Sequence, residues 1–393
     1  MESEEQSAAE QAAKERTAFQ EAAALKQWVD RDKPRRLHDT VPEHPFNIGA
    51  IDPEQARAIL REANTTMVIV APGLEELRVG TAKAVSLDTE RLLPRQTISG
   101  RRISYHRIGA PKVSLPATPI RSPALIGPQG DTYCCGSSIS VATEAPTGTL
   151  GCLIRIDGAL HGLTANHVSG LCHHTDTDMP IIGPGTLDIL PGNLDPRTLG
   201  HHVTCAPWRS GKQSNTNIID NLDLAIFRIK DDAALSSSQG WNYDTPVTVA
   251  ATASLAAARN VKVWKTGRTT GLTAGRLFGR IGHSIAIPLS EKHFKSVVHF
   301  ADLLVVEKDD EDEINKNKPF ATAGDSGSLV VWKRDGQVEA VGILFCTSPN
   351  DEKAFLMPME AVLGHFGATL VGGHNVKASN QGSGHPPHGA VRP

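Results

Sequence analysis

The sequence predicts a mainly β protein that is preceded by an N-terminal helix and a small α+β unit. Two observations lead to this fold class. Residues 131–372 carry short apolar runs with turn-forming residues at short intervals, as antiparallel β domains do. Residues 1–110 instead mix helical and strand patterns. At 393 residues the chain is long enough for two or three compact units.

A helical arm is expected over residues 1–35. Alanine and larger apolar residues alternate with Glu, Gln and Lys, and no Gly or Pro occurs before Pro34. The apolar stripe is thin, so a docking helix, an oligomerisation helix and a solvated arm all stay open. The larger apolar positions are Phe19, Leu25 and Trp28.

A small α+β domain is expected over residues 36–110. Its helix begins at Pro53, with Asp52 as the N-cap, because proline suits the first helical position and a carboxylate accepts from free N–H groups. No catalytic cluster occurs in this unit. The expected strands are the runs TTMVIVAP, GTAKAVSL and RRISYHRIG.

Two segments flank the main domain at 131–372. Residues 111–130 are rich in proline and are expected to form an extended connector. Residues 373–393 are poor in apolar side chains and are expected to form a disordered tail.

Composition excludes several function classes. The formal net charge of -3 gives no electrostatic reason to expect nucleic acid or an anionic membrane as a partner. No apolar run approaches the ~20 residues that a membrane-spanning helix needs. The N-terminus is acidic and polar, whereas a secretory signal starts basic and turns apolar. We therefore expect a cytoplasmic protein.

Free thiols are the default expectation for the cysteines of such a chain. A disulfide between Cys172 and Cys205 stays open as an alternative. The six cysteines are Cys134, Cys135, Cys152, Cys172, Cys205 and Cys346.

A zinc site is a second alternative for these residues, if two loops converge. The short fixed spacings of structural zinc sites are absent, so we expect no metal and no cofactor. The candidate ligands would be Cys172, His173 and His174 together with His201, His202 and Cys205.

A histidine is placed at the end of a predicted strand. Two apolar runs are joined by Asp157-Gly158, a dipeptide typical of a tight β-hairpin. The second run ends at TANHV, so His167 stands where the chain leaves the sheet.

An aspartate precedes another predicted strand, LAIFRI. A carboxylate directly before a buried apolar strand is unfavourable unless something pairs with it, which makes Asp223 a candidate partner for a base. A turn aspartate that caps its own backbone is the alternative.

A serine lies in a glycine-rich bend, AGDSGS, that precedes a hairpin at Asp335-Gly336. Gly324 and Gly327 permit backbone conformations that other residues resist. They allow successive N–H groups to point into one concavity, as an oxyanion site requires. Ser326 is therefore a candidate nucleophile.

The three candidates occur in the order His, Asp, Ser. Serine is a weak nucleophile until an imidazole takes its proton, and the imidazole needs a carboxylate to fix its tautomer. Together His167, Asp223 and Ser326 predict a catalytic triad.

These blocks resemble a known family. LTANHV, LDLAIFRI and AGDSGS are similar to the His, Asp and Ser blocks of trypsin-like serine peptidases of the chymotrypsin fold. The stretch VKVWKTGRTTGLTAGRLFG is similar to a strand–turn block of the bacterial streptogrisin and alpha-lytic types. With its N-terminal unit, the chain resembles the intracellular bacterial and plant branch. The resemblance covers about residues 131–372, and Ser328 departs from it, since a glycine often stands there.

The resemblance implies two six-stranded antiparallel β-barrels with the catalytic groups in the cleft between them. His167 would act as general base and Asp223 would orient it. Ser326 would attack the substrate, and the N–H groups of Gly324 and Ser326 would form the oxyanion hole.

It also implies a structural pairing and a specificity pocket. Lys265 would pair with Asp325, although a surface lysine stays open as the alternative. Phe320, with Cys346 and Ala354, would form an apolar pocket for a Leu, Met or aromatic side chain. The acidic run at 307–318 would be a solvated loop or would bring negative charge to the cleft.

The implied function is that of a serine endopeptidase. It would cleave proteins or peptides after apolar residues inside the cell, with a regulatory protein as a further partner at the N-terminal region. The alternatives are a catalytically silent scaffold that binds proteins, and an esterase that uses the same triad.

Overall fold

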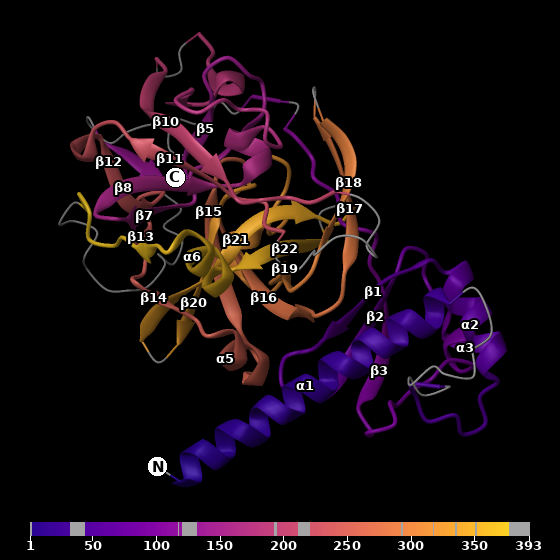
Figure 1. Ribbon diagram of the computed structural model, residues 1–393. Helices are drawn as coiled ribbons and strands as arrows, with labels where there is room; N and C mark the ends of the chain where they lie inside the picture. Colours follow the sequence, from indigo (N-terminus) through magenta and orange to yellow (C-terminus); the bar gives the residue numbers. More distant parts are fainter. Residues whose placement is uncertain are drawn as a thin grey trace.

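The computed structural model describes most of the chain (Figure 1). Most of the connector expected at 111–130 and of the tail expected at 373–393 falls outside the described residues. These are 2–31, 44–116, 118–119, 132–191, 195–210, 221–291, 294–316, 318–334, 336–349 and 352–376.

The C-terminal barrel is a closed ring of six antiparallel strands. The pairings run β15-β20-β21-β22-β19-β16 and return from β16 to β15. The strands are β15 (Lys262–Gly267), β16 (Gly271–Ile281), β19 (Leu303–Lys308), β20 (Leu329–Arg334), β21 (Gln337–Thr347) and β22 (Lys353–Pro358).

The N-terminal barrel is an antiparallel half-barrel, with pairings in the order β7-β8-β11-β10-β9-β5-β6. Only Leu150 and Gly151 separate β6 from β7, but these two strands are not paired with each other. The mainly β class and the two-barrel architecture are thus confirmed, whereas only the C-terminal barrel closes as a ring of six strands. The strands are β5 (Ser138–Val141), β6 (Thr147–Thr149), β7 (Cys152–Ile156), β8 (Ala159–Thr164), β9 (Pro180–Gly183), β10 (Arg197–Cys205) and β11 (Ala225–Ile229).

Two local predictions within the barrels concern hairpins. Asp157 and Gly158 have φ values of 47° and 80° and join β7 to β8, so this tight turn is confirmed. The strands β20 and β21 pair with each other on either side of Gly336.

Smaller elements decorate the barrels. A three-stranded sheet is formed by β4 (Tyr133–Cys135), β12 (Leu235–Gln239) and β13 (Tyr243–Asp244), and a hairpin by β17 (Ile285–Glu291) and β18 (Phe294–Phe300). The others are β14 (Thr248–Val249), β23 (Thr369–Leu370), α5 (Thr252–Ala257) and α6 (Met359–Phe366).

The N-terminal α+β unit is joined to the C-terminal barrel. Its strand β1 pairs with β16 at Val70 and Arg280, so its sheet continues the barrel sheet. Asp52 Oδ1 accepts from the N–H groups of Glu54 (3.0 Å) and Gln55 (3.4 Å), which confirms the predicted cap. The elements are α2 (Pro53–Glu62), α3 (Leu87–Glu90), β1 (Thr65–Val70), β2 (Glu76–Thr81) and β3 (Arg102–Arg107).

The strand expected in GTAKAVSL is wrong. The chain forms β2 earlier, at Glu76–Thr81, and reaches α3 instead of extending the strand. Ser86 caps that helix, since its side chain accepts from Thr89 N–H (3.2 Å). Strand β2 is stabilised by a distant partner, because Arg78 Nη1 donates to Phe278 O (2.8 Å).

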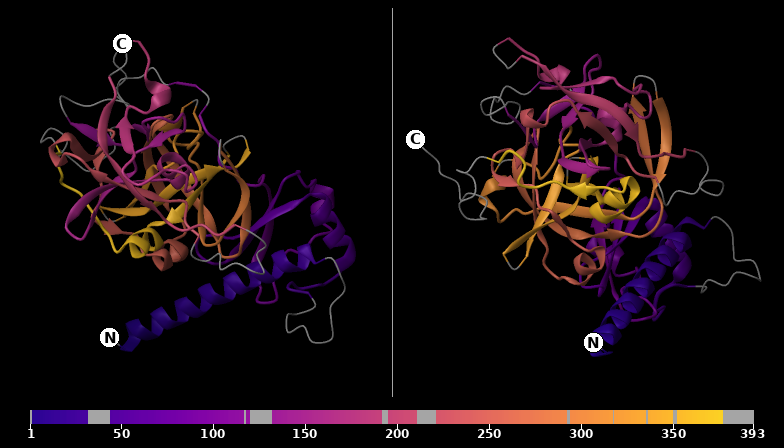
Figure 2. Two further views of the ribbon diagram at one scale, coloured as in Figure 1. Left: turned by 45° about the horizontal axis from the view of Figure 1, so that its top comes forward. Right: turned by 60° about the vertical axis from the view of Figure 1, so that its left-hand side comes forward.

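The helix α1 (Glu2–Asp30) docks on its own chain through its second half. Arg280 of the barrel lies 2.7 Å from Glu15 Oε1 and 5.0 Å from the ring centre of Phe19. The first turns extend past the body of the molecule (Figures 1 and 2). The buried apolar residues of the helix are Ala18, Ala22, Leu25, Trp28 and Val29.

The first residues of the expected tail are attached to the three-stranded sheet through β12 and β13. Gly373 N–H donates to Asp244 Oδ2 (2.6 Å), and His374 N–H donates to Ser237 Oγ (3.0 Å). The ordered chain therefore continues beyond the boundary expected for the segment 373–393.

A common apolar core joins the barrels. One cluster contains Leu163 and Ile226 of the N-terminal barrel together with Phe345 and Met357 of the C-terminal barrel. Buried contacts of this kind fix the two barrels relative to each other.

Candidate active site

The register of two neighbouring strands brings His167 and Asp223 together. Ala225 of β11 is paired with Thr164 of β8. Asp223 lies two residues before this pair and His167 three residues after it, so both leave the sheet at the same edge. His167 then stands in a tight turn at Asn166–Gly170, which is buried throughout.

The carboxylate of Asp223 holds both the ring and the backbone of His167. Oδ2 lies 2.5 Å from Nδ1, and Oδ1 accepts from the His167 N–H (3.1 Å). The side chains are 1% and 0% exposed. In a neutral imidazole, a proton on Nδ1 leaves Nε2 as the acceptor. The pair therefore directs a basic nitrogen away from Asp223.

Ser326 lies where the two barrels meet. Its carbonyl accepts from Thr149 N–H of the N-terminal barrel (2.9 Å). Gly327 has a φ of 95°, and a Cβ there would lie 2.3 Å from both Thr149 O and Thr164 Oγ1. Only glycine allows this approach, which puts the bend against the strand end that precedes His167.

The hydroxyl of Ser326 does not bond to the imidazole. Among the described residues it donates to Phe345 O (3.2 Å), and the side chain is 7% exposed. The structure thus brings His167 and Asp223 into contact, and it places Ser326 beside them without the third hydrogen bond.

Every second backbone N–H group of the bend from Gly324 to Gly327 donates a hydrogen bond to a backbone carbonyl. Those of Asp325 and Gly327 donate to Thr322 O (3.0 Å) and Leu344 O (2.7 Å). No acceptor is found among the described residues for the N–H groups of Gly324 and Ser326. Gly324 has a φ of 94°, which turns its peptide group out of the regular strand direction. Two N–H donors of the bend are thus available for a ligand.

Asp325, next to the serine, is held in a closed set of contacts. Lys265 Nζ lies 3.4 Å from Oδ2, and both side chains are 0% exposed. Oδ1 accepts from the N–H groups of Thr269 (2.9 Å) and Thr270 (3.1 Å), and Oδ2 accepts from Thr322 N–H (3.0 Å). Burial lowers the pKa of Lys265, and the charge of Asp325 opposes this.

Ser328 fits the bend. Its Oγ donates to Asp325 O (2.6 Å), and the residue is buried. The hydroxyl therefore braces the turn beyond the candidate nucleophile.

The three predicted pocket residues lie in two different core clusters. Phe320 and Ala354 belong to the apolar core of the C-terminal barrel, and Thr273 Oγ1 donates to Phe320 O (2.8 Å). Cys346 belongs to the cluster between the barrels. Burial raises the pKa of its thiol, and the nearby charge of Asp223 adds to this. Cys346 thus packs in a different core cluster from Phe320 and Ala354.

The central residues of the acidic run at 307–318 form ion pairs and hydrogen bonds with the C-terminal barrel. Asp309 Oδ1 accepts from Arg276 Nε (3.0 Å), and Asn315 Nδ2 donates to Asp309 O (2.6 Å). Lys262 Nζ lies 2.9 Å from Asp312 Oδ2. This part of the run is a packed loop with basic partners.

The cysteine alternatives are not supported. All six thiols are free, so the disulfide between Cys172 and Cys205 is wrong. Cys205 Sγ lies 3.7 Å from His202 Nε2. Burial raises the pKa of Cys205 to about 12 and lowers that of His202 to about 4, so both are neutral near pH 7. Within the described ranges, no three His, Cys, Asp or Glu side chains converge as metal ligands.

Sequence analysis missed two residues beside the bend. Arg268 stands in the GRTTG stretch but received no role, and Asp188 stands in no motif. The two side chains form a buried ion pair with an N–O distance of 2.5 Å.

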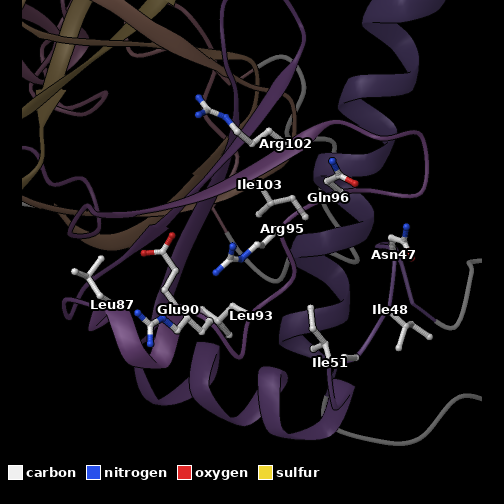
Figure 3. A pocket seen from close by; sticks show the side chains of 13 residues that line it. Asn47, Ile48, Ile51, Leu87, Glu90, Leu93, Arg95, Gln96, Arg102 and Ile103 are labelled. Carbon is white, nitrogen blue, oxygen red and sulfur yellow. The ribbon is translucent and has the colours of Figure 1, made fainter.

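A separate cavity of about 780 Å³ opens in the N-terminal unit. Figure 3 shows Arg95 and Arg102 among apolar residues such as Ile51 and Ile103 around it. None of the predicted site residues lines it.

No protein-family model and no curated protein matches the chain. Among the solved structures, protease A of Thermobifida fusca is similar over 61% of this chain and 100% of that chain, with 16% identity and a TM-score of 0.38. A chymotrypsin of Cellulomonas bogoriensis is 15% identical over 61% of this chain and 99% of that chain, with a TM-score of 0.36.

A protease of M. tuberculosis, in its active form, is 15% identical over 64% of this chain and 82% of that chain, with a TM-score of 0.31. These three solved structures are bacterial proteases. Similarity at this level assigns no activity. In the described part of the chain, no helix has both the length and the apolar character needed to cross a membrane.

Proposed function

We propose that the chain is a serine endopeptidase that uses Ser326, His167 and Asp223. The observation that carries this proposal is the buried contact of His167 Nδ1 with Asp223 Oδ2 (2.5 Å) at the edge where the bend of Ser326 packs. A base with a fixed tautomer beside a serine is the arrangement that acyl transfer requires.

In the proposed mechanism, the hydroxyl of Ser326 leaves Phe345 O and donates to Nε2 of His167. Its oxygen attacks the scissile carbonyl while Nε2 takes the proton. The N–H groups of Gly324 and Ser326 stabilise the oxyanion, and each such donor is worth about 3 kcal/mol. His167 then protonates the leaving amine, and water releases the acyl group by the same steps.

The contact of Lys265 with Asp325 keeps the bend in this shape. Asp325 is buried and accepts from three N–H groups, so it fixes the peptide units on both sides of itself. The site would then need no cleavage of the chain to become competent.

We further propose that the substrate side chain before the cleaved bond is apolar. Phe320, Cys346 and Ala354 carry no charge and are buried near the strand that follows the bend. Cleavage would take place in the cytoplasm, where free thiols such as those of the six cysteines persist. A regulatory protein would act through the N-terminal unit, whose strand β1 is paired with the barrel.

A silent scaffold is the second candidate, because the hydroxyl of Ser326 donates to Phe345 O and not to an imidazole. Hydrolysis of a fluorogenic peptide library decides between the two. We expect wild-type protein to cleave after apolar residues and Ser326→Ala to lose this activity while keeping its thermal unfolding temperature. Equal rates for both proteins would overturn the peptidase proposal.

A further inference from the structure

The ion pair of Arg268 and Asp188 crosses the interface between the barrels. Nη2 lies 2.5 Å from Oδ1 and Nε lies 2.7 Å from Oδ2, so the contact is bidentate. Both side chains are 0% exposed. Two parallel charge-assisted hydrogen bonds fix direction as well as distance.

The aspartate is anchored in the N-terminal barrel. It ends a short turn at Thr186–Asp188, and its Oδ2 also accepts from Ser138 Oγ of β5 (2.6 Å). The carboxylate is therefore held on its own side before the arginine reaches it.

Arg268 is the first residue of the turn between β15 and β16. This turn is hydrogen-bonded to the bend that contains Ser326. The next residue, Thr269, donates from its N–H to Asp325 Oδ1 (2.9 Å) and from its Oγ1 to Ala323 O (2.8 Å). A movement of Arg268 would thus be passed to the bend through one peptide unit.

A second link runs through Thr149 of β6. Its Oγ1 accepts from Arg268 N–H (3.0 Å) and donates to Gly324 O (2.9 Å). Its own N–H donates to Ser326 O (2.9 Å). The carbonyls of both proposed oxyanion residues are therefore bound by the N-terminal barrel.

The guanidinium also lies against the bend directly. A Cβ at Gly324 would be 2.6 Å from Arg268 Nη1, so the chain leaves just enough room for the arginine. A buried ion pair adds little net stability, because desolvation offsets the attraction, and an apolar pair of similar volume is often as stable. The contribution of this ion pair is therefore to hold Arg268 in a fixed position against the bend.

We propose that Arg268, bound to Asp188, is a positioning residue that sets the oxyanion bend of the C-terminal barrel against His167 of the N-terminal barrel. This inference rests on the proposed peptidase function. If the inference is right, catalysis requires that the two barrels are correctly positioned relative to each other, and not only that each barrel folds.

The test compares stability with turnover in two variants. Arg268→Met removes the bidentate ion-pair partner of the buried Asp188, so it should lower both the unfolding temperature and kcat. Arg268→Met with Asp188→Leu removes both charges, so the unfolding temperature should recover. We expect kcat of this double variant to stay about 100-fold below wild type with KM little changed, since a displacement of about 1 Å has an effect of that size.

A merely structural role would restore kcat together with stability, and that result would overturn the proposal. Arg268→Lys keeps the charge but not the bidentate geometry, so kcat should lie between wild type and Arg268→Met. A wild-type kcat in Arg268→Lys would also contradict the proposal. This measurement can be made even if the apolar variants do not fold.

Arg276→Met is the matched control. Arg276 lies in the same barrel, its side chain is 34% exposed, and it pairs with Asp309 and Glu311, so kcat should not change. A wild-type protein without any hydrolysis would overturn the proposed function and this inference with it, whereas an active wild type with restored kcat in the double variant overturns the inference alone.

Discussion

The two halves of the candidate site are stabilised in different ways. His167 and Asp223 follow neighbouring strands of one barrel, and the pairing of Ala225 with Thr164 is enough to bring them together. The bend of Ser326 depends on residues from several elements of both barrels, with two buried ion pairs beneath it. The position of the proposed base is thus set by local register, and that of the proposed nucleophile by long-range contacts. Substitutions on the two sides should therefore fail in different ways.

The largest effect is expected on the side of the base. Asp223→Asn would place an amide against Nδ1 of His167 and favour the wrong tautomer, so kcat should fall about 10⁴-fold with the fold intact. Peptide hydrolysis and thermal unfolding measure this. Asp231→Asn, at a surface turn where Asp231 accepts from Ala233 N–H (3.0 Å), is the control and should keep full activity. A small loss in Asp223→Asn would remove Asp223 from the mechanism.

A smaller loss of activity, with a loss of stability, is expected on the side of the nucleophile. Lys265→Met removes the cation that pairs with the buried carboxyl group of Asp325, which should destabilise the protein by about 3–5 kcal/mol. The substitution should also displace the bend. At temperatures below the unfolding temperature, kcat should therefore be about 100-fold lower than in wild type.

The control is Lys262→Met, on the same strand. Lys262 is 38% exposed and pairs with Asp309 and Asp312, so this change should be nearly neutral. Equal effects of the two substitutions would show that the contact of Lys265 with Asp325 has no special role.

The smallest expected effect is a dependence of stability on pH that is caused by His202. Burial lowers the pKa of His202 to about 4, below its ordinary value of 6.5. Between these values the unfolded chain binds the proton and the folded chain does not, so stability falls as the pH drops from about 6.5 to 4. Urea unfolding of wild type and His202→Gln at pH 4.5 and 7 checks this, and an identical pH slope in both proteins would contradict it.

Features with local causes could be predicted from the sequence. Asp157-Gly158 makes its hairpin and Asp52 caps its helix because the determinants lie within a few residues. The strand expected in GTAKAVSL failed because β2 depends on partners far away, such as Phe278 O for Arg78.

The candidate site shows the same division. The neighbouring strands of His167 and Asp223 could be inferred from two apolar runs. Asp188 could not be found, because its partner Arg268 is 80 residues away and neither stands in a pattern that requires the other. The pocket of Phe320, Cys346 and Ala354 stays a prediction, because Cys346 packs in a different core cluster from the other two and sequence distance from Ser326 does not determine side-chain direction.

Labelling by a fluorophosphonate, followed by mass spectrometry of the digested protein, tests the central claim most directly. Because such a probe reacts with a serine only where a base and an oxyanion site act together, we predict one adduct, on Ser326, that is absent from His167→Ala. An unlabelled Ser326 in folded wild-type protein, or equal labelling of both proteins, would contradict the account.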